Sequence, residues 1–116
     1  MTIEDMQAIC EQLPAVTKDI KWGHDLCFNI GDKMFVVIGL ESSPTSASFK
    51  VTDEEFQEMT NRDGFQPAPY VARYKWVSID DINRMSKKKW EYYIRQSYEL
   101  IKAKLPKKKL NQLGMG

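Results

Sequence analysis

The sequence contains few of the residues on which several protein classes depend. It has two cysteines, Cys10 and Cys27, and one histidine, His24, among 116 residues. Two cysteines are too few for a disulfide scaffold, and a structural zinc site needs four Cys or His ligands where this chain has three. The longest apolar run covers only residues 34–40, whereas a membrane span needs about 20 residues. We therefore expect no disulfide framework, no metal and no membrane partner.

Short motifs for common cofactors are also missing. The chain has no GxGxxG, GxxxxGK[ST] or HExxH pattern, so no nucleotide loop or metalloprotease helix is indicated and no cofactor is expected. The N-terminus reads MTIEDMQ, which is acidic where a secretory signal would be basic and then apolar. These features predict a cytoplasmic protein.

The composition is that of a soluble globular domain, with 42% hydrophobic and 28% charged residues. Its length suits one domain over residues 1–116. The net charge of +1 hides a split. Residues 1–83 carry seven Lys/Arg against fourteen Asp/Glu, and residues 84–116 carry ten against two. A basic C-terminal element on an acidic body indicates a polyanion-binding surface, a helix that neutralises its own domain, or a solvated helix face.

Hydrophobic periodicity predicts an α+β fold. We expect helices at residues 3–13, from Thr52, from Ser78 with Asp81, and from Ser86 to Leu105, with a basic tail from about residue 106. We expect strands at residues 16–22, 26–30, 34–40, 47–51 and around Trp76 and Val77. Residues 16–22 should have one apolar face, and residues 34–40 should be central. The predicted fold is an N-terminal helix, an antiparallel meander sheet of four to five strands, and C-terminal helices packed on it, with Phe35 and Trp90 in the core.

Only one catalytic arrangement is available to this sequence. His24 would have to act with Cys27 or with Asp25, because no other histidine exists. The alternative is that His24 is a turn residue and Cys27 a small packed side chain. We predict no catalytic residue and place an enzyme below a binding protein.

Two basic segments are candidates for contact with nucleic acid. Arg73-Tyr74-Lys75-Trp76 interleaves cations with aromatic rings, which could contact phosphates and stack on bases. In a strand its cations and rings would point to opposite faces, so core packing of the rings is the alternative. Lys87-Lys88-Lys89 opens the last helix, where cations oppose the helix dipole, and this placement indicates an anionic partner.

Four segments together resemble the MmcQ/YjbR family of small bacterial proteins. They are DIKWGHDLCFNIGDKMFVVIGL, SFKVTDEEF, PAPYVARYKWV and SYELIKAKLPKK, in the order of the family and spread over most of the chain. The resemblance implies a CyaY-like α+β fold and a DNA-binding role through an arrangement described as a double wing. The family is not defined by a catalytic residue set.

The resemblance also marks positions that are neither core nor turn. They suggest one polar-aromatic surface or groove beside the sheet, formed by Trp22, His24, Asp25, Lys33, Lys50, Tyr70, Arg73 and Trp76.

Our first hypothesis is a non-enzymatic DNA-binding protein. Its phosphate contacts would come from Arg73, Lys75, Lys87, Lys88, Lys89 and Arg95. The alternative is a module that binds a small anionic ligand or a peptide in the groove. A monomer or weak dimer is expected in either case.

Overall fold

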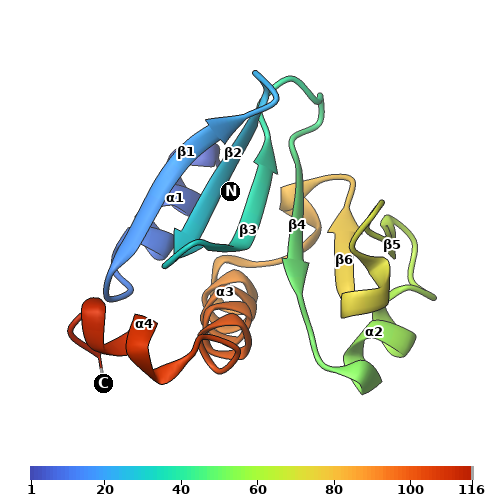
Figure 1. Cartoon of the computed structure of the whole chain (residues 1–116). Coiled ribbons are helices and arrows are strands. Elements are labelled where there is room, and N and C mark those ends of the chain that lie inside the picture. The colour runs from blue at the N-terminus through green and yellow to red at the C-terminus, as the bar shows by residue number, and fades with distance from the viewer. Residues whose placement is uncertain (116) are drawn as a thin grey trace.

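The computed structural model describes residues 1–115, and Gly116, the last residue of the predicted domain, lies outside them. The described residues form twelve elements, and Figure 1 labels the helices and strands among them. They are α1 (Ile3–Glu11), β1 (Val16–Lys21), β2 (Asp25–Ile30), β3 (Lys33–Gly39), β4 (Ser46–Lys50), α2 (Asp53–Met59), β5 (Phe65–Pro67), the 3₁₀ turn η1 (Ala72–Tyr74), β6 (Trp76–Ile79), the 3₁₀ turn η2 (Ile82–Arg84), α3 (Lys87–Lys102) and α4 (Lys107–Gln112). No described helix is long and apolar enough to cross a membrane.

The strands form one antiparallel sheet in the order β1-β2-β3-β4-β6-β5. The predicted α+β meander is confirmed, and β3 lies inside the sheet as expected. The sheet has six strands rather than four to five, because the extended segment at Phe65–Pro67 pairs with β6. Prolines in this segment disfavour helix but leave an edge pairing open.

Side chains along a strand point alternately to the two faces of the sheet, so every second side chain faces the helices. In β4, Ala47 and Phe49 are buried whereas Ser46 and Ser48 are half-buried. Phe49 packs edge-on against Trp90 of α3, with ring centroids 5.3 Å apart, and Phe35 packs in the same way against Tyr98 at 5.4 Å. Phe35 and Trp90 are fully buried, as predicted. The central contact of the core is therefore α3 on β3 and β4, with α1 beside α3.

β1 departs from its predicted apolar face. Val16 is half-buried, but Ile20 and Trp22 expose 59% and 67% of their surface. The strand itself is present, and it ends at Lys21 rather than at Trp22. Trp22 and Gly23 turn the chain with positive φ angles of 55° and 76°.

The predicted helix starts are largely confirmed. Thr2 and Thr52 each form a capping box, and Ser86 caps α3 by accepting a hydrogen bond from the Lys89 backbone. The third predicted start is wrong, because Ser78 belongs to β6. Asp81 alone caps the short η2 turn, through the backbone of Asn83.

The helix ends differ more from the prediction. α1 stops at Glu11 rather than at residue 13, and α3 stops at Lys102 rather than at Leu105. The basic segment after Pro106 is a helix, α4, and not a tail. Leu110 and Leu113 pack against the core, so burial of apolar side chains holds this lysine-rich turn in helical form.

The predicted strand around Trp76 and Val77 is confirmed as part of β6, whereas the residues directly before it form a turn. η1 covers Ala72–Tyr74, and Lys75 follows in a left-handed conformation with φ of 65°. β6 begins only at Trp76, which is buried. The alternation of cations and rings that a strand would produce therefore does not occur, and Tyr74 is exposed beside Arg73.

Candidate nucleic-acid interface

The first turn of α3 concentrates positive charge. Lys87, Lys88 and Lys89 follow the cap at Ser86, and this turn contains no acidic residue. The N-terminal end of a helix already carries a partial positive charge from its unpaired backbone N–H groups. Three lysines at this end therefore oppose the helix dipole and add to the attraction for an anion.

The three lysines point to different surroundings. Lys87 lies near Asp5 at the start of α1. Hydrogen bonds with Thr2 are the main cause of the lowered pKa of Asp5, and the positive charges of the N-terminal ammonium and of Lys87 lower this pKa further. Lys88 and Lys89 lie on the other side, together with Ser86, Tyr92 and Tyr93. These five residues line an open hollow of about 440 Å³. The hollow is thus bordered by two lysines, one serine and two tyrosines.

The two tyrosines of the hollow have different roles. Tyr93 is half-buried, and its ring centroid lies 5.8 Å from that of Phe49. Burial is the main cause that raises the pKa of the Tyr93 hydroxyl, and the negative charge of nearby Glu55 raises it further. Tyr92 stands edge-on to Tyr93 at 5.1 Å, and 57% of its surface is exposed. Gln96 donates a hydrogen bond of 3.3 Å to the Tyr92 hydroxyl. Tyr93 therefore anchors an aromatic platform, and Tyr92 presents a ring to solvent.

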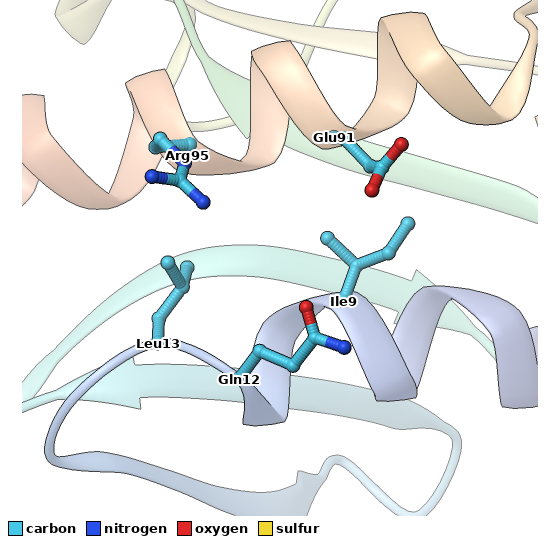
Figure 2. A pocket seen from close by; sticks show the side chains of 5 residues that line it. All are labelled: Ile9, Gln12, Leu13, Glu91 and Arg95. Atoms are coloured by element: carbon cyan, nitrogen blue, oxygen red, sulfur yellow. The ribbon is translucent and has the colours of Figure 1, made fainter.

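Arg95 lies elsewhere on α3, two turns after Lys88. It lines a narrow groove between α1 and α3 (Figure 2). Glu91 lies on the same side of this groove, and the opposite side is formed by residues of α1 and its C-terminal end, namely Ile9, Gln12 and Leu13. The carboxylate of Glu91 borders the same groove. Arg95 is thus separated from the hollow and has a carboxylate as a neighbour.

Arg73 and Lys75 form a third group around η1. The Arg73 guanidinium donates a 2.7 Å hydrogen bond to the Tyr74 hydroxyl and lies 4.8 Å from its ring centroid. The Lys75 ammonium lies 5.1 Å from the ring of Phe56 in α2. The six predicted phosphate contacts therefore fall into separate groups, of which only Lys88 and Lys89 line the hollow.

Close ion pairs do not neutralise the basic C-terminal part. Within residues 1–115, the pairs closer than 4.0 Å are Lys18–Glu11, His24–Asp25, Arg62–Glu58 and Arg84–Asp80. Of the ten cations from Arg84 onward, only Arg84 itself appears in this set. The lysines of α3 and α4 are therefore not held against the acidic body by direct contacts.

The predicted polar-aromatic groove does not form as one surface. Trp76 and Lys50 are only 5% and 8% exposed, whereas Trp22 and Tyr70 are exposed at 67% and 100%. The Lys50 ammonium donates to the backbone oxygen of Tyr74. Burial, together with Lys104 and Lys75, lowers the pKa of Lys50. Lys33 is exposed at the opposite end of β3 from Gly39, which pairs with Asp25. The shared surface was a wrong prediction because it treated two buried residues as surface residues.

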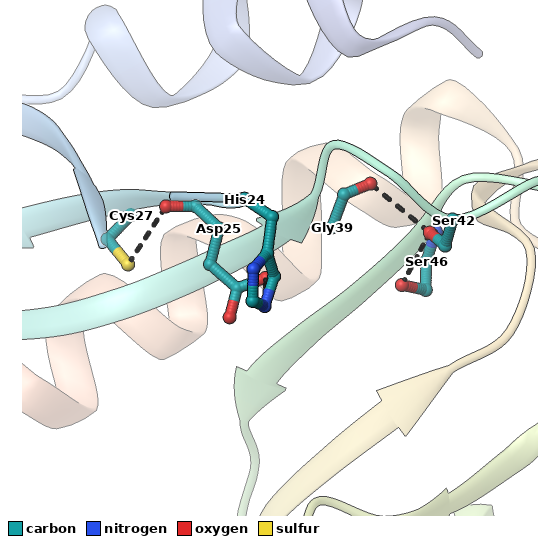
Figure 3. A network of polar contacts seen from close by, with 6 residues as sticks. All are labelled: His24, Asp25, Cys27, Gly39, Ser42 and Ser46. Carbon is teal, nitrogen blue, oxygen red and sulfur yellow. Dashed lines mark hydrogen bonds and ion pairs between the residues drawn. The ribbon is translucent and has the colours of Figure 1, made fainter. Parts of the chain in front are cut away.

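His24, Asp25 and Cys27 lie close together around the start of β2 (Figure 3). The imidazole Nε2 of His24 is 3.9 Å from Asp25 Oδ1, and the Cys27 thiol donates to the Asp25 backbone oxygen at 3.7 Å. Burial raises the pKa of Cys27 to about 11, so its sulfur stays protonated at neutral pH and is a poor nucleophile. Nearby, Ser42 donates to the Gly39 backbone oxygen and contacts Ser46 at 2.9 Å. These hydrogen bonds stabilise the loop after β3.

The site residues predicted from the sequence did not include Ser86, Tyr92 and Tyr93. A signal for them was present, because residues three and four apart on a helix share a face. Lys88 with Tyr92, and Lys89 with Tyr92 and Tyr93, have this spacing. The spacing alone could not show that the rings remain partly exposed.

Comparison with known proteins supports the fold and the family. No curated protein matches the chain. A crystal structure of the Deinococcus radiodurans protein DR2400, a domain of the DUF419 type, matches with a TM-score of 0.86 and 21% identity over 99% of this chain and 89% of that one. A structural-genomics protein from Pseudomonas syringae matches with a TM-score of 0.70 and 16% identity over 86% of this chain and 98% of that one. At these identities the two structures show the fold alone.

The sequence profile of one family covers most of the chain. It is the YjbR family, and the match spans residues 11–100. This span runs from the end of α1 through every strand and into α3. The chain therefore belongs to the YjbR family.

Proposed function

We propose that this protein binds DNA without catalysing a reaction on it, and that the hollow at the start of α3 is its principal contact. The observation that carries the proposal is the lining of this hollow, in which Lys88 and Lys89 stand beside the exposed ring of Tyr92. Cations with a neighbouring exposed ring are the pair that nucleic-acid-binding surfaces use for phosphates and for bases.

Electrostatics favour a phosphate at this point. The free backbone N–H groups of the first turn, the positive charges of Lys88 and Lys89, and the positive end of the helix dipole all favour an anion at this helix end. Neither lysine has a carboxylate within 4.0 Å in residues 1–115. A phosphate bound here would therefore not have to displace an internal ion pair.

Tyr92 gives the hollow a preference for an unpaired base. Stacking of a base on an aromatic side chain contributes about 1–3 kcal/mol, and a base within a duplex is not available for it. We therefore expect tighter binding to single-stranded than to double-stranded DNA. Arg73 and Lys75 would add phosphate contacts at a distance from the hollow. Trp76 takes no part because it is buried.

Fluorescence anisotropy of labelled single- and double-stranded DNA over a salt series tests the proposal. Each phosphate contact adds about 0.7 to the slope of log affinity against log salt for a single strand and about 0.9 for a duplex. The double variant Lys88→Glu with Lys89→Glu should weaken binding at least tenfold and lower the single-strand slope by about one or more.

The matched control carries the same charge change in α4, as Lys107→Glu with Lys108→Glu, and should retain most of the affinity and slope. Tyr92→Ala should weaken single-strand binding alone. Loss of affinity in both charge variants equally would mean that only net charge matters, and no binding by the native chain at low salt would refute the proposal. Competition by a free mononucleotide with no binding of longer DNA would instead assign the hollow to a small anionic ligand.

A further inference from the structure

The two edges of the sheet are built differently. β5 is three residues long and ends in Pro67, which has no backbone N–H to offer another strand. β1 is six residues long, contains no proline, and pairs only with β2 within residues 1–115. Its outer side therefore presents a row of backbone donors and acceptors, and such edges pair readily with another strand.

Exposed apolar side chains lie on the same edge. Ile20 in β1 and Trp22 directly after it expose 59% and 67% of their surface. Trp22 also holds a left-handed backbone conformation, which disfavours side chains other than those of Gly, Asn and Asp. An asparagine would suit this turn better, so the tryptophan is explained more readily by a contact than by the turn itself.

The charges along β1 select how a second copy could pair with it. In an antiparallel pair with twofold symmetry, side chains directly opposite each other share a face of the sheet. Centring the pair on Lys18, Asp19 or Lys21 places two like charges face to face. Centring it on Thr17 leaves Ile20 and Trp22 outside the contact. Centring it on Ile20 places Asp19 opposite Lys21 of the second copy, and Lys21 opposite Asp19.

We infer that β1 pairs antiparallel with β1 of a second copy of this chain, with Ile20 on the twofold axis. The two Ile20 side chains then cover each other, and two Asp19–Lys21 pairs flank them. Asn29 of β2 donates a 2.9 Å hydrogen bond to Asp19 Oδ1 and so holds this carboxylate in place. Lys18, which is 2.7 Å from Glu11, would lie opposite Trp22 of the second copy. The result is a continuous twelve-stranded sheet.

Sedimentation equilibrium of the full chain tests this dimer. A single strand edge buries little surface, so the dimer should be weak and should form between about 5 μM and about 500 μM. Over this range the weight-average mass of the native protein should rise from that of one chain toward that of two.

Two charge reversals provide the decisive comparison. Asp19→Lys places lysine opposite lysine, and Lys21→Glu places acid opposite acid, so each variant alone should stay monomeric. An equimolar mixture of the two restores opposite charges at both contacts and should form a heterodimer as readily as the native protein. Lys33→Glu, an equal charge change at an exposed residue away from β1, should still dimerise.

The mixing experiment also shows that both variants are folded, because an unfolded chain could not restore the dimer. A native protein that remains monomeric at about 500 μM would overturn the inference. Dimerisation of both single variants, or a mixture that stays monomeric while the native protein dimerises, would overturn it as well, since the contact would then lie elsewhere or have another register.

Discussion

Trp90 joins the two layers of the molecule through one side chain. Its ring is fully buried against Phe49, and its indole Nε1 donates a 2.7 Å hydrogen bond to the backbone oxygen of Ile82. Loss of this ring would leave both a cavity and an unpaired buried carbonyl. Residues such as Tyr92, whose ring is exposed, have neither role.

Trp90→Ala should lower the free energy of unfolding by about 3–5 kcal/mol, because the cavity term adds to the lost burial. Urea unfolding followed by circular dichroism measures the change. Tyr92→Ala is the matched control and should lower the free energy of unfolding by less than about 1 kcal/mol. A loss of under about 1 kcal/mol for Trp90→Ala would contradict the packing described above.

The two cysteines should differ in reactivity although both are buried. Burial raises the pKa of Cys10 to about 12 and that of Cys27 to about 11, against 9.0 ordinarily. Since the thiolate is the reactive form, neither thiol of the folded protein should react rapidly with a disulfide reagent at pH 8. As pH rises, Cys27 should react before Cys10.

The same shifts make the thiols a source of instability at alkaline pH. The unfolded chain loses its thiol protons near pH 9 whereas the folded chain keeps them to higher pH, so stability falls as pH rises above about 9. Cys10→Ala with Cys27→Ala should reduce this fall, as measured by thermal unfolding at pH 8 and pH 10. Rapid reaction of both native thiols at pH 8 would contradict the burial.

At the scale of elements, α3 supplies side chains both to the core and to the proposed site. Substitution of its N-cap residue, Ser86, can distinguish effects on stability from effects on DNA binding. Ser86→Ala removes the side-chain acceptor for the Lys89 N–H and should cost about 1 kcal/mol of stability with little effect on DNA binding. Ser86→Asp keeps an acceptor and should retain stability, but it adds a carboxylate to the hollow that Lys88 and Lys89 line and should weaken DNA binding. Thermal unfolding and anisotropy measure the two effects. Equal effects of both variants on DNA affinity would show that Ser86 does not border the bound anion.

The elements that could be predicted are those set by local chemistry. Capping boxes at Thr2 and Thr52 and the apolar face of α3 depend on neighbours within one or two turns, and the structure has them as expected. β5 and α4 depend on distant partners. β5 exists because β6 lies beside it, and α4 because Leu110 and Leu113 find the core. No local pattern encodes either contact.

The candidate site follows the same division. The lysines of the first turn of α3 could be identified from their position in the sequence alone. The burial of Lys50 and Trp76 could not, because it results from η1 folding beside β4 and β6 around the left-handed Lys75. Lys50 and Trp76 each stand in a segment whose alternation of residue types is typical of a surface strand. Tertiary contacts, however, decide which of these residues are exposed to water.

At the scale of the whole molecule, the acidic and basic parts of the chain are joined by few close ion pairs. The acidic residues dominate up to residue 83 and the basic residues from Arg84 onward, yet only the Arg84–Asp80 pair among the described ion pairs joins the two parts. A domain with near-zero net charge can in this way still present a local positive field at one helix end.

The position of α3 along the chain has a consequence for synthesis. The face of the sheet that α3 covers belongs to strands complete by residue 79, whereas α3 ends at Lys102. A ribosome adds about 5–20 residues per second and releases a nascent chain from the N-terminus first. Phe35 and Phe49 therefore emerge well before Trp90 and Tyr98 can cover them. During that interval we expect the unfinished protein to need protection by chaperones, and a message truncated before α3 should yield a chain prone to aggregate.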